Sequence, residues 1–423
     1  MSFLAAFLLA TAMPMAPGAG VLSLPEAQRR ALERSRQLDA LDAGIASSRH
    51  LAVAAGQLPD PVLRIGVDNV PADGGDRFSL TRDFMTMRRI GVMQEVTRSG
   101  KRELRRQRYE LEAEKGSAER QAALAAVQRD TAIAWLDRWH LEAMLRAAQD
   151  FVVSSEAEVQ SADTAYRGGR GAQADVFATR GAVGLAQDRR AEIERRLRQA
   201  RIELARWTGG SPEEPLTGPP DMTAVALAAG ELEQHLRTHP EIVALGRQAA
   251  IATMEARIAD TARRPDWTWE ASFQQRGSAY SNMFSVGVSI PLPWDPANRQ
   301  DREVAARTAL AEEASARRDE MLRAHVAEVA GLLDEWRTGR ERSARYRREI
   351  LPLAVERTRA SVAAYAGGKS TLSDVLAARR NEADLLLQAI QIELETAKAW
   401  ARLAFLLPDE SIHRDRIHGS RPQ

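Results

Sequence analysis

The feature that most constrains this chain is a segment of 16 residues that occurs twice. Residues 165–180 read AYRGGRGAQADVFATR, and residues 364–379 read AYAGGKSTLSDVLAAR. At an offset of 199 the two segments share eight identical positions, where average composition gives roughly one. Each copy places Gly-Gly between two long helical patterns. The sequence therefore predicts a duplicated helical hairpin that bends at each Gly-Gly.

The duplication predicts two structural repeats, 21–207 and 223–407, joined by a Gly/Pro-rich linker at 208–222 and followed by a flexible tail at 408–423. Each repeat carries two strand candidates before its hairpin. In the first repeat these are residues 62–70 and 90–97, with the hairpin tip at 166–174. In the second they are residues 267–274 and 283–290, with the tip at 365–373.

The helical patterns are very long. No proline occurs between residues 99 and 165, where small and apolar residues recur every seven positions, as in a coiled coil. A second long helix is expected from about residue 297 to 366, with a kink at Pro352. Aromatic residues make up 5% of the chain and charged residues 28%, which suits extended helices better than a thick globular core.

The N-terminus begins with an apolar run at 3–12 that is followed by small residues and proline, which predicts a signal peptide over residues 1–20. The chain contains no cysteine, which excludes disulfides and thiolate chemistry. A net charge of +1, without a basic cluster interleaved with aromatics, gives no indication of nucleic-acid binding.

The strand candidates of the second repeat have one apolar and one polar face. The apolar residues that we expect to face lipid are Trp267, Trp269, Phe273, Phe284, Val286 and Val288. Four strands cannot close a barrel, because the smallest closed barrels have about eight. Three chains would supply 12 strands, so the fold class expected is mainly α with a small β part. It combines long helical hairpins with strands that contribute to a trimeric 12-stranded transmembrane β-barrel.

No catalytic, cofactor-binding or metal-binding residues are predicted. Nucleophile-elbow, phosphate-loop and dinucleotide motifs are absent from the sequence. His235 and His239 have the i, i+4 spacing of a helical metal site, but Pro240 indicates a helix break there. A structural or solvated role is therefore favoured for both histidines.

The chain resembles the TolC family of outer-membrane efflux channels in the order of its elements. That order, which occurs twice, is short helices, two strands, a long helix, a glycine turn and a second long helix. The sequence motif at the hairpin tips, Tyr-x-x-Gly followed by Asp-Val, supports the resemblance, which covers about residues 22–407. The segments 58–61 (LPDP), 94–96 (QEV) and 100–102 (GKR) are similar to the heavy-metal-cation, CzcC-like branch.

The resemblance implies a passive, non-enzymatic conduit in the outer membrane of a Gram-negative bacterium, with a long periplasmic extension. It implies a homotrimer that works with a periplasmic adaptor protein and an inner-membrane RND-type pump, and that exports substrates such as divalent heavy-metal cations. The family's tips dock the adaptor and form the closing aperture. These roles carry over to Gly168, Gly169, Gly367, Gly368, Ser370 and Thr371 for docking, and to Asp175 and Asp374 for the aperture.

Alternatives stay open at this point. Asp175 and Asp374 lie in the first turn of a helix, where capping or dipole stabilisation is favoured without excluding gating. The family's second acidic residue, one turn later, is replaced by Ala377. The competing function is a periplasmic coiled-coil scaffold or adaptor without a channel. The paired amphipathic strands in both repeats favour the channel.

Overall fold

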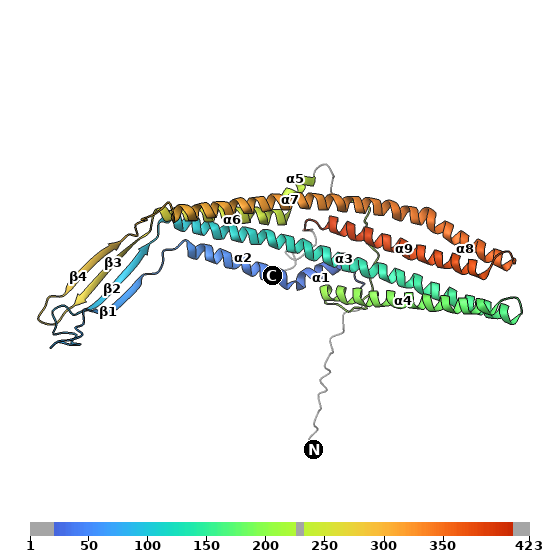
Figure 1. Cartoon of the computed structure of the whole chain (residues 1–423), viewed down its shortest axis with the longest axis horizontal. Coiled ribbons are helices and arrows are strands. Elements are labelled where there is room, and N and C mark those ends of the chain that lie inside the picture. The colour runs from blue at the N-terminus through green and yellow to red at the C-terminus, as the bar shows by residue number, and fades with distance from the viewer. Residues whose placement is uncertain (1–20, 226–231, 409–423) are drawn as a thin grey trace, which may run out of the picture. The chain divides into compact units, whose positions relative to one another are not determined.

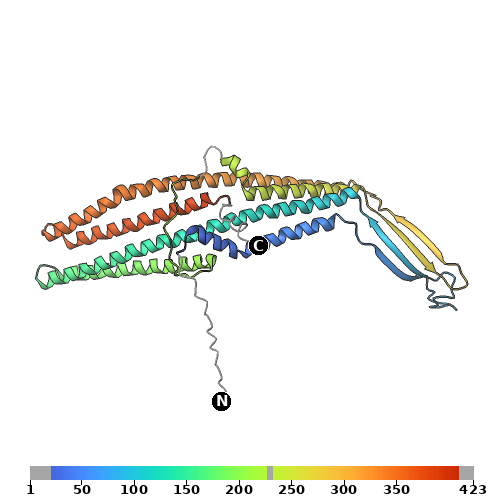
Figure 2. The same ribbon diagram turned by 180° about the vertical axis from the view of Figure 1, so that it is seen from behind.

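The computed structural model describes residues 21–225 and 232–408 (Figure 1; seen from behind in Figure 2). The chain divides into two compact units. The first consists of Met1–Ser35, Leu124–Gly230 and Glu328–Gln423, and the second of Arg36–Ala123 and Glu231–Ala327. The predicted signal peptide and the predicted tail beyond Pro408 lie outside the described residues, as do residues 226–231.

The first unit contains the two predicted hairpins. It holds α1 (Leu24–Arg34), the later part of α3 (Ser99–Arg167), α4 (Gln173–Thr208), the end of α7 (Gln300–Arg345), η3 (Tyr346–Ile350), α8 (Leu351–Ala366) and α9 (Leu372–Ala404). Within this unit α4 returns along α3 and α9 returns along α8 (Figures 1 and 2). The predicted fold of long, duplicated helical hairpins is therefore confirmed.

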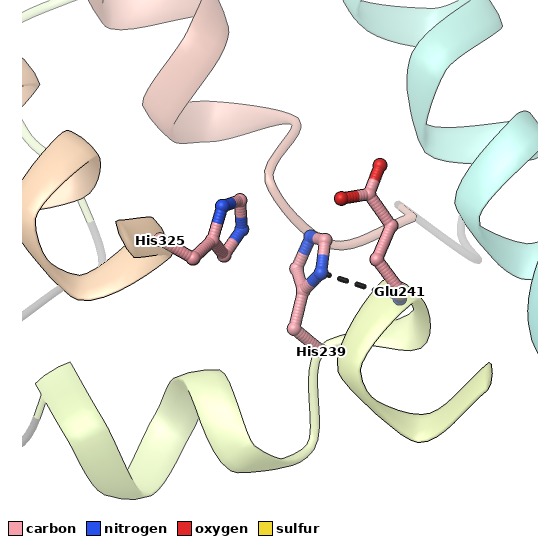
Figure 3. A group of neighbouring side chains, drawn as sticks. All are labelled: His239, Glu241 and His325. Carbon is pink, nitrogen blue, oxygen red and sulfur yellow. Dashed lines mark hydrogen bonds between the residues drawn. The ribbon is translucent and has the colours of Figure 1, made fainter. Parts of the chain in front are cut away.

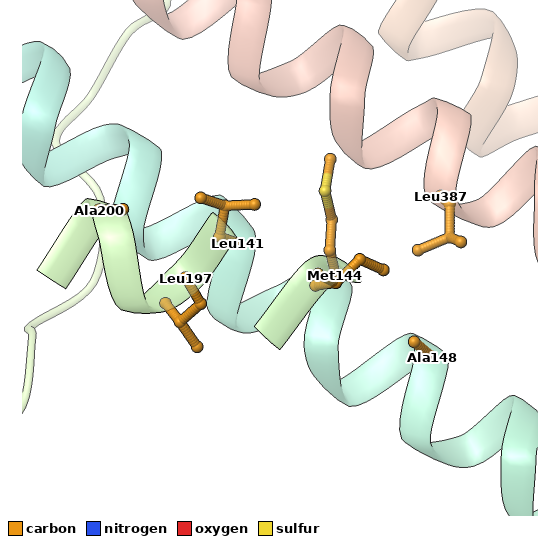
Figure 4. Packing of buried hydrophobic residues seen from close by; sticks show 7 residues of the cluster. Leu141, Met144, Ala148, Leu197, Ala200 and Leu387 are labelled. Atoms are coloured by element: carbon orange, nitrogen blue, oxygen red, sulfur yellow. The ribbon is translucent and has the colours of Figure 1, made fainter. Parts of the chain in front are cut away.

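A narrow apolar seam holds the hairpins together. One cluster joins three helices: Leu141, Met144 and Ala148 of α3, Ile193, Leu197 and Ala200 of α4, and Leu387 of α9 (Figure 4). The α3 and α4 members recur at spacings of three, four or seven residues, the periodicity of helices that pack side by side. Each fully buried leucine contributes roughly 1.5–3 kcal/mol relative to exposure. The seam leaves the remaining helix faces to charged residues.

Pro352 is accommodated by a π turn. The five residues of η3 have π-helical geometry, and the Leu351 N–H donates to the carbonyl of Tyr346, five residues earlier. Proline lacks the N–H of an α-helix and its ring clashes with the carbonyl four residues before it. Widening the preceding turn relieves the clash, because it moves that carbonyl away from the ring. The interruption expected at Pro352 is thus present as a π turn between α7 and α8.

The second unit contains a four-stranded sheet. Its helices are α2 (Arg36–Ala55), the start of α3, α5 (Leu232–Arg237), α6 (Pro240–Asp260) and the start of α7, with a short 3₁₀ turn, η2 (Thr261–Arg263). Its strands are β1 (Val62–Asp68), β2 (Met87–Val96), β3 (Trp267–Gln275) and β4 (Met283–Ser289). They form one antiparallel sheet in the order β1-β2-β3-β4. The predicted strands all exist, although β2 begins three residues before the predicted residue 90.

The described helices give no membrane span. In residues 21–225 and 232–408, none combines the length and the apolar character needed for a membrane crossing.

Candidate functional site

The first hairpin tip turns through a left-handed glycine. Gly169 has φ of 69°, and nothing lies within 4 Å of the position that a Cβ would occupy. The Arg170 N–H donates to the Ala165 carbonyl (2.9 Å), and the Gly169 N–H donates to the Tyr166 carbonyl (3.0 Å). These two bonds define a Schellman motif, which satisfies the last carbonyls of α3. The glycine is required for its backbone conformation, since the surrounding space is open.

The second tip repeats this geometry. Gly368 has φ of 68°, the Lys369 N–H donates to the Ala364 carbonyl (2.8 Å), and the Gly368 N–H donates to the Tyr365 carbonyl (3.0 Å). Gly367, by contrast, has φ of −83°, which any residue can adopt. The two Gly-Gly pairs therefore form the same turn. In each pair the second glycine has the left-handed backbone conformation that favours glycine.

The helix that leaves the second tip is capped by side chains. The Asp374 N–H donates to Thr371 Oγ1 (3.3 Å), and Asp374 Oδ2 accepts from the Thr371 N–H (3.0 Å). The same oxygen accepts from the hydroxyls of Thr371 (2.7 Å) and Ser370 (3.0 Å). These hydrogen bonds, with the Thr371 side chain first, hold the pKa of Asp374 below its usual value. Asp374 is therefore an exposed, ionised capping residue.

The helix that leaves the first tip is capped on one side only. Asp175 Oδ2 accepts from the Ala172 N–H (3.2 Å), but Ala172 has no side-chain acceptor to offer in return. The first amides of α4 consequently lack the reciprocal hydrogen bond that Thr371 supplies in α9. The capping role expected for both aspartates is present, and it is stronger at the second tip.

Behind the tips, equivalent residues of the two repeats pack together. Val176 and Val375, one residue after the two aspartates, share a buried cluster with Ala162 and Leu372. Glu158 of α3 forms an ion pair with Arg379 of α9, and burial, opposed by Arg379, raises the pKa of Glu158. This ion pair was not predicted, although Arg379 is one of the residues repeated in both tip segments. The packing fixes the first turn of α4 close to that of α9.

The sheet has one exposed apolar face. The register places Trp269 opposite Val288, and Phe273 opposite both Phe284 of β4 and Ile90 of β2. Directly paired residues project from the same face of a sheet. All six residues predicted to face lipid lie on this face, and Leu63, Ile65, Val67 and Val92 extend it. Phe284 is 71% exposed and Ile65 is 75% exposed, whereas Trp269 is half-buried.

The opposite face of the sheet is polar and charged. Arg64 of β1 forms an ion pair with Glu270 of β3 (3.1 Å), and Arg89 of β2 with Asp68 of β1 (3.3 Å). Gly91 also lies on this face, where an added Cβ would approach the Ser272 Cβ to 2.7 Å. These ion pairs were not predicted, because β1 alternates poorly and the paired residues are distant in the chain. The sheet thus separates an apolar surface from an ionic one.

The two histidines with i, i+4 spacing do not share a helix, in agreement with the break expected at Pro240. His235 lies in α5, which ends at Arg237, whereas His239 is the N-cap of α6. Within the described residues, one group of three potential metal ligands lies close together: His239, Glu241 and His325. His325 lies in α7, far along the chain from His239, so sequence spacing could not predict that the two residues are close.

Comparison with known proteins agrees with this geometry. The outer membrane efflux protein family matches residues 232–408. No curated protein matches the chain. Three similar solved structures are the outer-membrane channel OprN (TM-score 0.76, 19% identity), CusC (0.77, 15%) and the CmeC outer membrane channel of Campylobacter jejuni (0.77, 12%). Alignments with them cover 91%, 95% and 93% of this chain, and 90%, 99% and 88% of theirs.

The solved structures show that this chain has the fold of a class of proteins, the TolC-type outer-membrane channels. Residues 232–408, which carry β3, β4 and the second hairpin, are the part that matches the outer membrane efflux protein family directly.

Proposed function

We propose that three copies of this chain form a passive conduit through which substrates leave the cell. The two-faced sheet is the observation that carries this proposal. Its exposed apolar face suits contact with outer-membrane lipid, and its ionic face, with Arg64, Arg89 and Glu270, suits a water-filled lumen. Three such sheets supply a twelve-stranded wall. Channels of this class form trimers within tripartite pumps, which supports the stoichiometry.

The hairpin tips are the proposed docking surface for a periplasmic adaptor. The exposed backbones of Gly168, Gly169, Gly367 and Gly368 allow a partner helix to approach closely, since none carries a side chain. The hydroxyls of Ser370 and Thr371 already donate to Asp374, so at the second tip docking depends mainly on backbone and shape. An inner-membrane RND-type pump would supply the substrate through that adaptor.

Asp374, and with it Asp175, is proposed to contribute negative charge to the aperture. The lowered pKa of Asp374 supports this role, because the carboxylate stays ionised at periplasmic pH. Asp374→Ala should weaken the block of single-channel current by multivalent cations. The same block in the Ala variant would remove Asp374 from the aperture and leave it as a capping residue.

Divalent heavy-metal cations are the proposed substrates. The support is the similarity of residues 58–61, 94–96 and 100–102 to the heavy-metal branch. The test compares a strain that lacks the gene with one that carries it, on plates with Zn²⁺, Co²⁺ or Cd²⁺ and on plates with organic toxins. Protection against organic toxins alone would overturn the metal assignment while leaving the channel intact.

The decisive experiment on the conduit is electrical. The detergent-extracted protein is weighed as an intact complex and then added to a planar lipid bilayer. A trimer that gives discrete conductance steps is the expected result. A monomer that gives none would overturn the conduit and favour the alternative, a periplasmic coiled-coil scaffold.

A further inference from the structure

Two imidazole rings and a carboxylate meet in the second unit. His239 precedes α6, Glu241 lies in the first turn of that helix, and His325 projects from α7 (Figure 3). The ring centroids of His239 and His325 are 4.5 Å apart, with the planes tilted by 53°. One donor atom from each of the three residues lies within 4.8 Å of the other two.

The local fold holds one of these residues firmly. His239 is 5% exposed, and its Nδ1 accepts from the Glu241 N–H (3.4 Å) as the helix N-cap. Pro240 comes next and fixes the first helical φ. The capping contact turns the other ring nitrogen, Nε2, away from the helix end. Glu241, which is exposed, keeps a side chain that can move towards that nitrogen.

We propose that His239, Glu241 and His325 bind one divalent transition-metal ion of the Zn²⁺ class. Two imidazoles and one carboxylate form a ligand set that zinc commonly uses, with a water in the fourth position. Zinc ligands at about 2.0–2.2 Å in a tetrahedron lie about 3.3 Å from one another. The three donor atoms already lie within 4.8 Å of one another, so binding an ion requires the Glu241 and His325 side chains to turn inward. Ca²⁺ and Mg²⁺ fit poorly, because both prefer oxygen ligands alone.

The charges nearby do not oppose a cation. The arginines on the adjoining turns of α5, α6 and α7 each have a carboxylate partner. The pairs are Arg237–Glu233 (2.7 Å), Arg247–Glu114 (3.0 Å) and Arg318–Asp319 (2.7 Å). The Glu241 carboxylate then supplies a negative charge to the ion itself. Two neutral imidazoles and one carboxylate leave a divalent site with a net charge of about +1.

Metal binding has a proton requirement. With Nδ1 accepting from Glu241, the neutral His239 ring carries its proton on Nε2. An ion at Nε2 requires that proton to move to Nδ1, which gives up the cap bond. At 3.4 Å this bond is long, so its loss is a small cost. Because an imidazole binds a metal ion only through a deprotonated nitrogen, protons compete with the ion for both rings.

The test is isothermal titration of the full-length detergent trimer with Zn²⁺, purified without a polyhistidine tag. The starting protein carries His413→Asn and His418→Asn, which removes two other histidines of the chain. One ion per chain is expected. Co²⁺ should give the visible absorption bands of a tetrahedral site.

Three variants locate the ion. His325→Phe keeps a ring and removes both nitrogens, His239→Asn keeps an N-cap acceptor, and Glu241→Gln keeps the shape without the charge. Each histidine variant should weaken binding about a hundredfold or more, because even outer-shell partners of metal ligands contribute about 10–100-fold. Glu241→Gln should weaken it less. His235→Asn, on the exposed face of α5, is the matched control and should bind like the parent.

The outcomes separate a metal site from a packed histidine pair. Unchanged binding in His325→Phe and His239→Asn, or no binding in the parent protein, would overturn the proposal and leave the rings as packing. If a variant forms no trimer, the Co²⁺ spectrum of the parent protein still tests the metal site. Absorption bands that indicate no imidazole ligand would contradict the proposal. The result is independent of channel conductance.

Discussion

The two hairpin tips share one turn but differ in how the outgoing helix is capped. Both bend through a Schellman motif with a left-handed glycine, at Gly169 and at Gly368. Three residues later the second tip carries Thr371 and its reciprocal hydrogen bonds with Asp374, where the first carries Ala172. Backbone conformation therefore determines the turn, whereas the cap determines the stability of the first turn of the helix that follows. Duplicated segments can keep the same turn while the capping of the following helix changes.

The largest effect is expected from forcing a branched side chain into the turn. Gly368→Val places valine at φ of 68°, which costs at least about 1–2 kcal/mol, the cost of a left-handed conformation for an L-residue. We expect the turn to open, export to fail and trimers to remain in the outer membrane. Export assays and native mass measurement of the extracted protein check this.

Two controls accompany that change. Gly367→Ala, at φ of −83°, should be tolerated, and Gly368→Asn should retain most function because asparagine visits the left-handed region. If Gly367→Ala were as damaging as Gly368→Val, the Gly-Gly pairs would be needed for close approach of a partner rather than for the turn. Loss of membrane trimers would mean that the turn matters for folding.

An intermediate effect is expected from exchanging the caps. Thr371→Ala should destabilise the first turn of α9 by about 1 kcal/mol, and Ala172→Thr should stabilise that of α4 by a similar amount. Hydrogen exchange of the amides in both first turns should change roughly fivefold, in opposite directions. Equal exchange at the two tips of the parent protein would contradict the difference in capping between them.

The smallest effect concerns pH. The pKa of Asp374 is lowered in the folded protein, so its contribution to stability is present above its ordinary pKa. That contribution is lost as pH falls through the lowered value. The melting temperatures of parent and Asp374→Asn should therefore differ at pH 6 and converge as the pH falls well below the ordinary aspartate pKa of about 3.9. A difference that persists in acid would show that the asparagine acts through something other than charge.

Local patterns in the sequence predicted much of this molecule. Gly-Gly, the absence of proline from 99 to 165 and the alternation in β3 predicted both turns, the long hairpins and the strand faces, because each depends on neighbouring residues. Contacts between distant segments could not be predicted in this way. The Arg64–Glu270 pair joins residues 206 positions apart, and His239 meets His325 of a distant helix. Neither partner leaves a periodic signal.

The π turn before Pro352 has a consequence for the phase of the helix. One extra residue in a turn rotates everything beyond it by about 100° relative to an uninterrupted α-helix. Heptad positions counted before Tyr346 therefore cannot be carried past Leu351. The residues that face the neighbouring helix therefore lie on one side of the helix before the π turn and on another side after it. The Arg347–Glu393 ion pair (2.7 Å) joins the π turn to α9. Deleting a single residue in the π turn would restore the heptad register and rotate the packing face of α8 away from α9.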